Sequence, residues 1–146
     1  MTWLREFDFT DMTVSDQTRA DLNHAADAFI QAWATGDWAP FTSMFADDFV
    51  FQFPAGPHSG RRHGSEARRH MEQWSTDAAV NARIAANENL RLIDGDWLVL
   101  AMRGEGQMAG RPYRGVETVF LRMQAGRIVE YREYLSELGD LNDQRK

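Results

Sequence analysis

Three charged side chains near the ends of two apolar segments have the residue types that acid/base chemistry requires. Arg103 and Glu105 lie two residues apart in the segment 97–107, and Glu133 lies near the end of the segment 127–135. An arginine stays protonated and can bind two carboxylates at once. Unequal burial raises the pKa of one carboxyl group and pairing lowers that of the other, which yields one proton donor and one base. The alternative is a structural salt-bridge network at the rim of a sheet.

These residues are expected on three successive strands joined by turns rich in glycine. The predicted strands are 97–107, 113–124 and 127–135. Because residues two apart in a strand share a face, Arg103 and Glu105 lie on the same side of the first strand. We expect Arg103 to meet Glu133 as well, so that all three side chains converge at one end of a curved sheet.

The upstream sequence indicates helices that cover this sheet. Apolar residues at helical spacing predict a first helix, and Asp37 caps a second helix that runs through Phe45. The first helix is predicted at 16–34. The other predicted elements are a strand at 49–53, a loop at 55–64, a third helix at 65–76 and a strand at 80–93 with a bulge at 87–89. The order predicts an α+β fold, in which a curved antiparallel sheet wraps around N-terminal helices and encloses a pocket.

Length and composition indicate one globular domain. We expect an N-terminal extension at 1–14, a single domain at 15–138 and a C-terminal tail at 139–146. The net charge of −6, without a long basic run, argues against binding to nucleic acid or an anionic membrane. There are no cysteines and no long uncharged apolar run, so we expect a cytoplasmic protein.

Aromatic and polar residues on the same elements are candidates for a substrate-binding pocket. Glu117 shares a strand face with Val119, although an exposed strand glutamate is the alternative. His58 and His63 lie in the glycine-rich loop and are either substrate contacts or solvated side chains. The other candidate lining residues are Phe29, Trp33, Phe51, Phe53, Trp74, Val119 and Tyr131. No histidines and carboxylates have the spacing of metal ligands, so we expect neither metal nor cofactor.

Five stretches carry a resemblance to a known superfamily: 32–37, 44–51, 54–56, 60–67 and 126–134. Together they resemble the nuclear-transport-factor-two-like superfamily, and most closely its SnoaL-like branch of polyketide cyclases and related proteins. The resemblance implies a cystatin-like α+β cone with an internal pocket. That fold carries isomerases, dehydratases, cyclases, epoxide hydrolases and non-enzymatic binders, so it does not settle the function.

The resemblance can be carried over residue by residue. The catalytic aspartate, the tyrosine and the protonated aspartate of ketosteroid isomerase correspond to Phe53, Phe29 and Val119, so that pattern is not kept. The limonene epoxide hydrolase pattern is closer, because its two Asp-containing strands resemble 103–105 and 131–134 with Glu in place of Asp. Its water-holding tyrosine and asparagine correspond to Phe51 and Phe53, which puts hydrolysis in doubt.

The resemblance therefore implies a cofactor-independent enzyme that acts on a hydrophobic polyketide- or terpenoid-sized molecule by isomerisation, cyclisation, dehydration or epoxide opening. A non-catalytic binding protein and a dimeric accessory subunit without activity are the alternatives. We also expect a homodimer that forms through an apolar outer face of the sheet. The residues assigned to that face are Leu98, Leu100, Met102, Val116 and Phe120.

Overall fold

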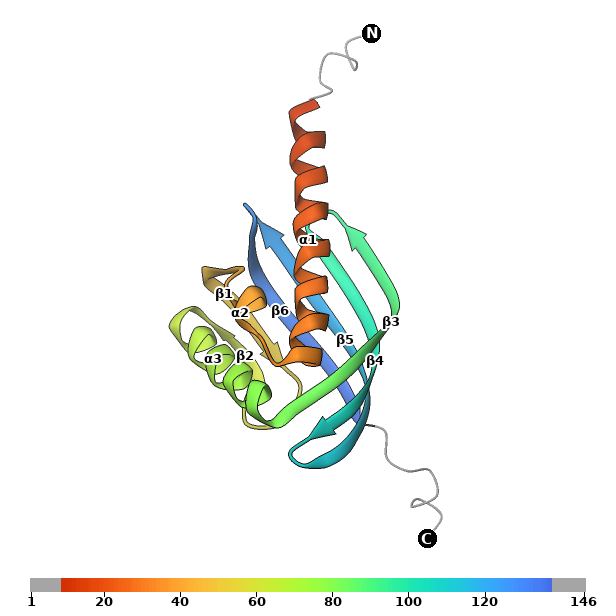
Figure 1. Cartoon of the computed structure of the whole chain (residues 1–146). Helices are drawn as coiled ribbons and strands as arrows, with labels where there is room; N and C mark the ends of the chain where they lie inside the picture. Colours follow the sequence, from red (N-terminus) through yellow and green to blue (C-terminus); the bar gives the residue numbers. More distant parts are fainter. Residues whose placement is uncertain (1–8, 138–146) are drawn as a thin grey trace.

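The computed structural model describes residues 9–137, with side chains for residues 16–136 (Figure 1). The predicted tail at 139–146 and most of the predicted extension at 1–14 lie outside the described residues. The helices are α1 (Phe9–Thr35), α2 (Ala39–Thr42) and α3 (Gly64–Asn81). The strands are β1 (Phe45–Phe53), β2 (Gly60–His63), β3 (Ala82–Asp94), β4 (Trp97–Met108), β5 (Arg111–Gln124) and β6 (Arg127–Glu137).

The strands form one six-stranded sheet in the order β2-β1-β6-β5-β4-β3. The strands β3 to β6 are joined as successive antiparallel hairpins, as predicted. The helix α1 crosses the concave face of this curved sheet (Figure 1). The α+β fold class and the wrapping of the sheet around the first helix are therefore confirmed.

The first part of the sheet differs from the prediction in the direction of one strand pair, in an additional short strand and in the end of the second helix. The strand β1 runs parallel to β6, with Phe51 beside Tyr131, and the short strand β2 forms within the predicted loop. The second helix ends at Thr42 instead of reaching Phe45, because Phe45 pairs with Ile128 as the first residue of β1. Sheet pairing overrides the local helical pattern at this point.

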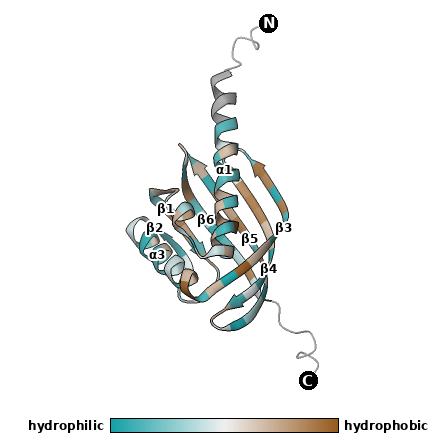
Figure 2. Cartoon of the chain, in the orientation of Figure 1, coloured by the Kyte–Doolittle hydropathy of each residue, from teal (hydrophilic) through white to brown (hydrophobic). Residues whose placement is uncertain are grey.

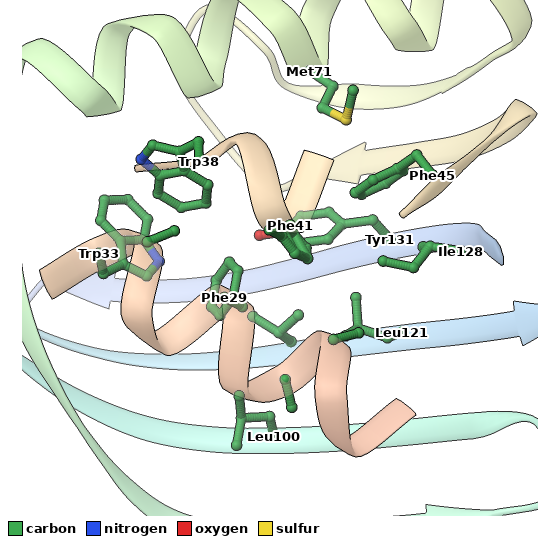
Figure 3. Packing of buried hydrophobic residues seen from close by; sticks show 14 of the residues in the cluster. Phe29, Trp33, Trp38, Phe41, Phe45, Met71, Leu100, Leu121, Ile128 and Tyr131 are labelled. Atoms are coloured by element: carbon green, nitrogen blue, oxygen red, sulfur yellow. The ribbon is translucent and has the colours of Figure 1, made fainter. Parts of the chain in front are cut away.

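The core lies between α1 and the concave face of the sheet. Phe29 of α1 packs against Phe41 and Tyr131, with ring centroids 5.2 and 6.1 Å apart (Figure 3). The strands that α1 crosses carry many hydrophobic residues (Figure 2). The buried positions of α1 include Ala25, Ala26 and Ala32. These small side chains let the helix approach the sheet closely, so the aromatic rings fill the space toward α2 and α3.

The buried face of β4 is opposite to the one expected from the sequence. Leu98, Leu100 and Met102 are fully buried against α1. They were expected on the outer face, so that part of the prediction is wrong. Alternation establishes which residues share a face but not which face is buried. Trp97, Val99 and Ala101 give the outer face apolar residues as well. The prediction took the charged end of that face as a site and therefore assigned it to the interior.

The predicted bulge in β3 is confirmed and fixes the position of α1. The register of β3 against β4 shifts between Glu88 and Leu90. As a result Arg91 points inward, where its guanidinium donates hydrogen bonds to Asn23 and Asp27 of α1 at 3.0 and 2.8 Å. The bulge thus anchors the helix that covers the concave face.

Candidate functional site

A pocket of about 260 Å³ opens between α3, the loop 54–59 and the far end of the sheet. Its apolar walls come from α1, α3 and four strands: Trp33, Phe53, Trp74, Ala78, Ala82, Met108 and Leu135. Three residues of the sheet bring polar groups to its interior: Tyr113, Glu117 and Glu133. His58, Asp77 and Asn81 add polar groups from the loop and from α3. The pocket therefore joins a hydrophobic wall to a small set of titratable groups, as ligand sites commonly do.

Glu117 and Glu133 form a buried pair in this pocket, with only 6% and 2% of their surface exposed. Glu133 lies opposite Val119 in the β5–β6 ladder, and Glu117 is two residues from Val119 on the same face. The Tyr113 hydroxyl donates a hydrogen bond to Glu117 Oε1, and the Tyr131 hydroxyl donates one to Glu133 Oε1, both at 3.1 Å. Two tyrosine–glutamate pairs therefore stand diagonally on neighbouring strands.

Burial raises the pKa of both carboxyl groups, and the charge of Glu117 adds to the effect at Glu133. Burial raises the pKa of Glu133 well above its ordinary value of 4.5, and the charge of Glu117 raises it further, against the opposing effect of the Tyr131 hydrogen bond. Burial also raises the pKa of Glu117, which the Tyr113 hydrogen bond opposes. Because the two groups interact, the pair titrates as a unit and tends to retain a proton. Such a pair supplies one acid and one carboxylate.

The tyrosine beneath Glu133 remains a hydrogen-bond donor. Burial raises the pKa of Tyr131 well above 10, and the charges of Glu133 and Glu117 raise it further. Its hydroxyl therefore keeps its proton at any ordinary pH and continues to orient the Glu133 carboxyl group.

Two glycines make room for the second tyrosine. Gly104 of β4 and Gly115 of β5 lie opposite each other on the inner face. A Cβ atom on Gly115 would overlap the Tyr113 hydroxyl, and one on Gly104 would lie 2.8 Å from Ile84 Cγ2 and 3.6 Å from the Tyr113 ring. Glycine at both positions thus lets the Tyr113 ring lie flat enough to reach Glu117.

His58 and His70 link the loop 54–59 to α3 at the edge of the pocket. Their Nδ1 atoms are 3.0 Å apart, so the N–H group of one ring donates a hydrogen bond to the other ring. Burial lowers the pKa of both rings, and the charge of Arg62 lowers both further. His70 is only 8% exposed, although the sequence suggested a surface position. The helical pattern did not show that the loop folds back over this residue.

Replacing His70 with Ala is expected to release the loop from α3. Among the described residues, the only other side-chain link between the loop and this helix is Arg62, whose guanidinium donates to the carbonyls of His58 and Ser59 and pairs with Glu66. Hydrogen exchange at residues 56–59 should therefore accelerate several-fold in His70→Ala. The control is His63→Ala, since His63 is exposed and its side chain does not cap α3. Equal exchange in both variants would show that the histidine link does not hold the loop.

The structure brings together only some of the site residues predicted from the sequence. Six of them line the pocket: Trp33, Phe53, His58, Trp74, Glu117 and Glu133. Tyr131 lies beside them through its bond to Glu133, and three others belong to the core instead: Phe29, Phe51 and Val119. His63 is exposed at the start of α3 and is not among the lining residues.

The predicted convergence of Arg103, Glu105 and Glu133 is wrong. The side chains of Arg103 and Glu105 are 44% and 54% exposed and form a 3.5 Å ion pair with each other on the outer face of β4. Glu105 also lies 3.7 Å from Arg114, on the same exposed face. Glu133 is on the inner face, so the sheet separates it from both. The inferred match of 103–105 to the epoxide hydrolase pattern therefore fails at this strand.

Several pocket residues were not assigned to the site from the sequence. Tyr113 is the most informative, because it lies four residues before Glu117 in a strand and so shares its face. Alternation alone was sufficient to pair the two. Asp77 and Asn81 were missed because the predicted third helix ended at 76, whereas α3 continues to Asn81.

Within the described residues, no group of three or more His, Cys, Asp or Glu side chains is arranged to hold a metal ion. In the same part of the chain, no helix combines the length and apolar composition needed to cross a bilayer.

Comparison with known families matches residues 26–131 to the SnoaL-like domain. The chain belongs to this family. The matched range includes α2, α3 and five of the six strands in full, together with the part of α1 that packs on the sheet. The family match therefore covers most of the residues that build the pocket. Comparison with curated proteins finds no match.

Solved structures of other SnoaL-like and related proteins share the fold. An NTF2-like protein from Anabaena variabilis is 27% identical, with a TM-score of 0.76 over 86% of this chain and 93% of that one. A limonene-epoxide-hydrolase-like enzyme from Mycobacterium tuberculosis is 16% identical, with a TM-score of 0.64 over 80% and 84%. A proposed SnoaL-like polyketide cyclase from Jannaschia sp. CCS1 is 12% identical, with a TM-score of 0.58 over 78% and 86%. The last two similarities establish a common fold and carry no reaction to this chain.

Proposed function

We propose that this SnoaL-like protein is a cofactor-independent enzyme that moves a proton on a small hydrophobic molecule. The observation that carries the proposal is the buried pair Glu117 and Glu133, each held by a tyrosine hydroxyl inside an apolar pocket. A carboxylate and a carboxylic acid side by side are the minimum for paired proton removal and proton donation. Isomerisation, cyclisation, dehydration and epoxide opening all use such a pair, and the fold neighbours include an epoxide hydrolase and a proposed cyclase.

The two carboxyl groups differ in the role that each is suited to perform. Glu133 is the more deeply buried, and its pKa is raised well above the ordinary value, so it holds the shared proton and acts as the acid. Glu117 is left as the base, oriented by Tyr113. Proton removal by Glu117 from the ligand and proton donation by Glu133 to a ligand oxygen leave the pair with one proton, now on Glu117. Transfer of that proton back to Glu133 restores the starting state without a cofactor.

The pocket size limits the substrate. A volume of about 260 Å³ is at or below the lower end of the ~300–1,000 Å³ typical of ligand pockets. A molecule of monoterpenoid size is therefore a better fit than a large polycyclic polyketide. Trp33, Phe53 and Trp74 would contact its apolar part, because their rings line the pocket.

The proposal can be tested without knowing the natural substrate. The base-catalysed ring opening of 5-nitrobenzisoxazole reports any carboxylate base in an apolar pocket, because the reaction accelerates when the base is desolvated. The wild-type protein should accelerate it above free acetate at the same pH, and the doubly substituted Glu117→Gln, Glu133→Gln protein should not. The control is Glu105→Gln, which changes an exposed glutamate on the other face of the sheet. Equal rates in the wild-type and doubly substituted proteins would refute the acid/base role.

A non-catalytic binding protein is the second candidate. The observation that favours it is the extent of the apolar wall, which would hold a hydrophobic ligand without any help from the carboxyl pair. This candidate predicts tight ligand binding together with no acceleration in the ring-opening assay. The same pair of measurements therefore separates the two functions.

We also propose that the chain forms a homodimer through the outer face of the sheet. Of the five residues assigned to that interface, Val116 and Phe120 do lie on the outer face. Three apolar side chains continue the surface across neighbouring strands, with Leu92 opposite Val99 and Val99 opposite Phe120. Leu90 and Tyr134 add further exposed apolar area. A patch of this kind favours an isologous contact with a second copy.

A positive charge in the centre of that patch is expected to prevent dimer formation. Phe120→Lys would place an ammonium group between two copies of the same surface, where like charges repel and lose hydration. Sedimentation velocity at micromolar concentration should show a dimer for the wild type and a monomer for this variant. Val80→Lys, at an exposed apolar residue of α3, is the matched control. A wild-type protein that is monomeric under these conditions would contradict the proposal.

A further inference from the structure

The pocket concentrates acidic groups without a compensating cation. Glu117, Glu133 and Asp77 all line it, whereas no lysine or arginine is among its described lining residues. His58 is the one basic side chain in that lining, and burial lowers its pKa, so it is neutral near pH 7. The ion pairs formed by described residues include neither Glu117 nor Glu133.

Each buried carboxyl group accepts a hydrogen bond from a neighbouring tyrosine. Oε1 of Glu117 accepts from Tyr113, and Oε1 of Glu133 accepts from Tyr131. An ionised carboxylate can accept about four hydrogen bonds. Each group can therefore accept further hydrogen bonds from a ligand in the pocket.

Aromatic rings line the same pocket as these oxygens. Trp74 packs between Trp33 and Phe53, with ring centroids 6.0 and 5.8 Å away, and all three contribute to the wall. The face of an aromatic ring attracts cations, tryptophan most strongly, and the attraction grows when water is excluded. A wall of aromatic rings opposite buried carboxyl groups is therefore complementary to a cation that carries an apolar group.

From these three observations we infer that the natural ligand of this pocket is a small hydrophobic amine, bound as its ammonium form between the carboxyl pair and the tryptophan wall. The inference rests on the proposed function and names its substrate class. The ammonium N–H groups would donate to carboxyl oxygens of Glu117 and Glu133. The apolar part of the ligand would contact Trp33 and Trp74.

The number of protons balances whether the ligand enters as a neutral amine or as an ammonium ion. A ligand that enters as a neutral amine takes the proton of the glutamic acid, so an O–H bond breaks and an N–H bond forms. A ligand that enters already protonated leaves the shared proton in place and neutralises the single negative charge of the pair. In both cases the bound complex contains one ammonium group next to at least one carboxylate. A carboxylate ligand would instead add a second negative charge beside that of the pair and be repelled.

The inference is tested with three molecules of nearly equal size, namely benzylamine, benzyl alcohol and benzoate, titrated into the full-length protein at pH 7 by calorimetry or NMR. We expect benzylamine to bind at least tenfold more tightly than benzyl alcohol, and benzoate to bind more weakly than either. In the Glu117→Gln, Glu133→Gln protein the preference for the amine should fall to less than twofold. Glu117→Gln alone serves if the doubly substituted protein does not fold, because Glu117 carries the negative charge of the pair. Glu105→Gln should keep the wild-type preference.

The outcomes distinguish this inference from the function on which it rests. Benzyl alcohol that binds as tightly as benzylamine would overturn the ammonium assignment and leave the acid/base pocket intact. A preference for benzylamine that survives the loss of both glutamates would also overturn it, because the site would then lie elsewhere on this acidic protein. Failure of all three molecules to bind would overturn the pocket itself, and the proposed function with it.

Discussion

Glu117→Gln is expected to lower the rate of 5-nitrobenzisoxazole ring opening by about 10²–10⁴-fold, the usual contribution of a positioned general base. The amide keeps the shape of the side chain and can still accept from Tyr113, but it cannot take a proton. The loss should appear in kcat rather than KM, because an isosteric change leaves the apolar wall unaltered.

Glu133→Gln provides the matched comparison within the same pair. It removes the proton donor, which is still protonated and uncharged when Glu117 ionises, so the pKa of Glu117 should change little. The rate should therefore drop while the acid limb of its pH profile stays where it is in the wild type. Both the rate and the profile should be unchanged in Glu105→Gln, since Glu105 is exposed on the outer face. A Glu117→Gln protein with wild-type kcat would show that Glu117 is not the base.

Glu133→Gln is also expected to make the protein more stable at neutral and alkaline pH. Burial raises the pKa of Glu133 in the folded state well above its ordinary value of 4.5. The folded chain thus keeps a proton that the unfolded chain releases, and stability falls as pH rises above about 4.5 until the folded-state pKa is passed. Below about pH 4.5 this carboxyl group is protonated in both the folded and the unfolded chain, so its ionisation no longer affects stability. Each unit of raised pKa corresponds to about 1.4 kcal/mol.

Urea unfolding at a series of pH values between about 4 and about 9 measures this effect. The wild type should lose more stability across the series than Glu133→Gln, and the two proteins should differ least at the acid end. A glutamate held in a salt bridge would behave in the opposite way, because its substitution removes a favourable interaction at neutral pH. A Glu133→Gln protein that is less stable than the wild type at neutral pH would therefore contradict the buried pair.

The fold could be predicted from the sequence because its signals are local. The turns at 94–96, 109–110 and 125–126 fixed the order of the last four strands, and alternation fixed their shared faces. The pairing of β1 beside β6 could not be predicted, since it joins segments about 80 residues apart without a turn between them. The same holds for the contact of His58 with His70, which depends on how a loop folds over a helix.

The site was predicted correctly only where alternation and burial agreed. Glu133 lies in a strand whose inner residues include Tyr131, and its place in the pocket follows from that pattern. Arg103 and Glu105 were placed by their charge, on the assumption that charged residues at a strand end face a site. Both faces of β4 are apolar, so one wrong choice of face moved these two residues inward and Leu98, Leu100 and Met102 outward.

The central claim is that Glu117 and Glu133 share a pocket and perturb each other's ionisation. It is tested most directly by following the side-chain carboxyl carbons of both residues by NMR as a function of pH, in the wild type and in Glu117→Gln. The account predicts that Glu133 titrates well above 4.5 in the wild type. In Glu117→Gln its pKa should decrease but stay above that value, because burial remains when the neighbouring charge is gone. An ordinary pKa for Glu133 in the wild type, or a raised pKa that the loss of Glu117 leaves unchanged, would contradict the account.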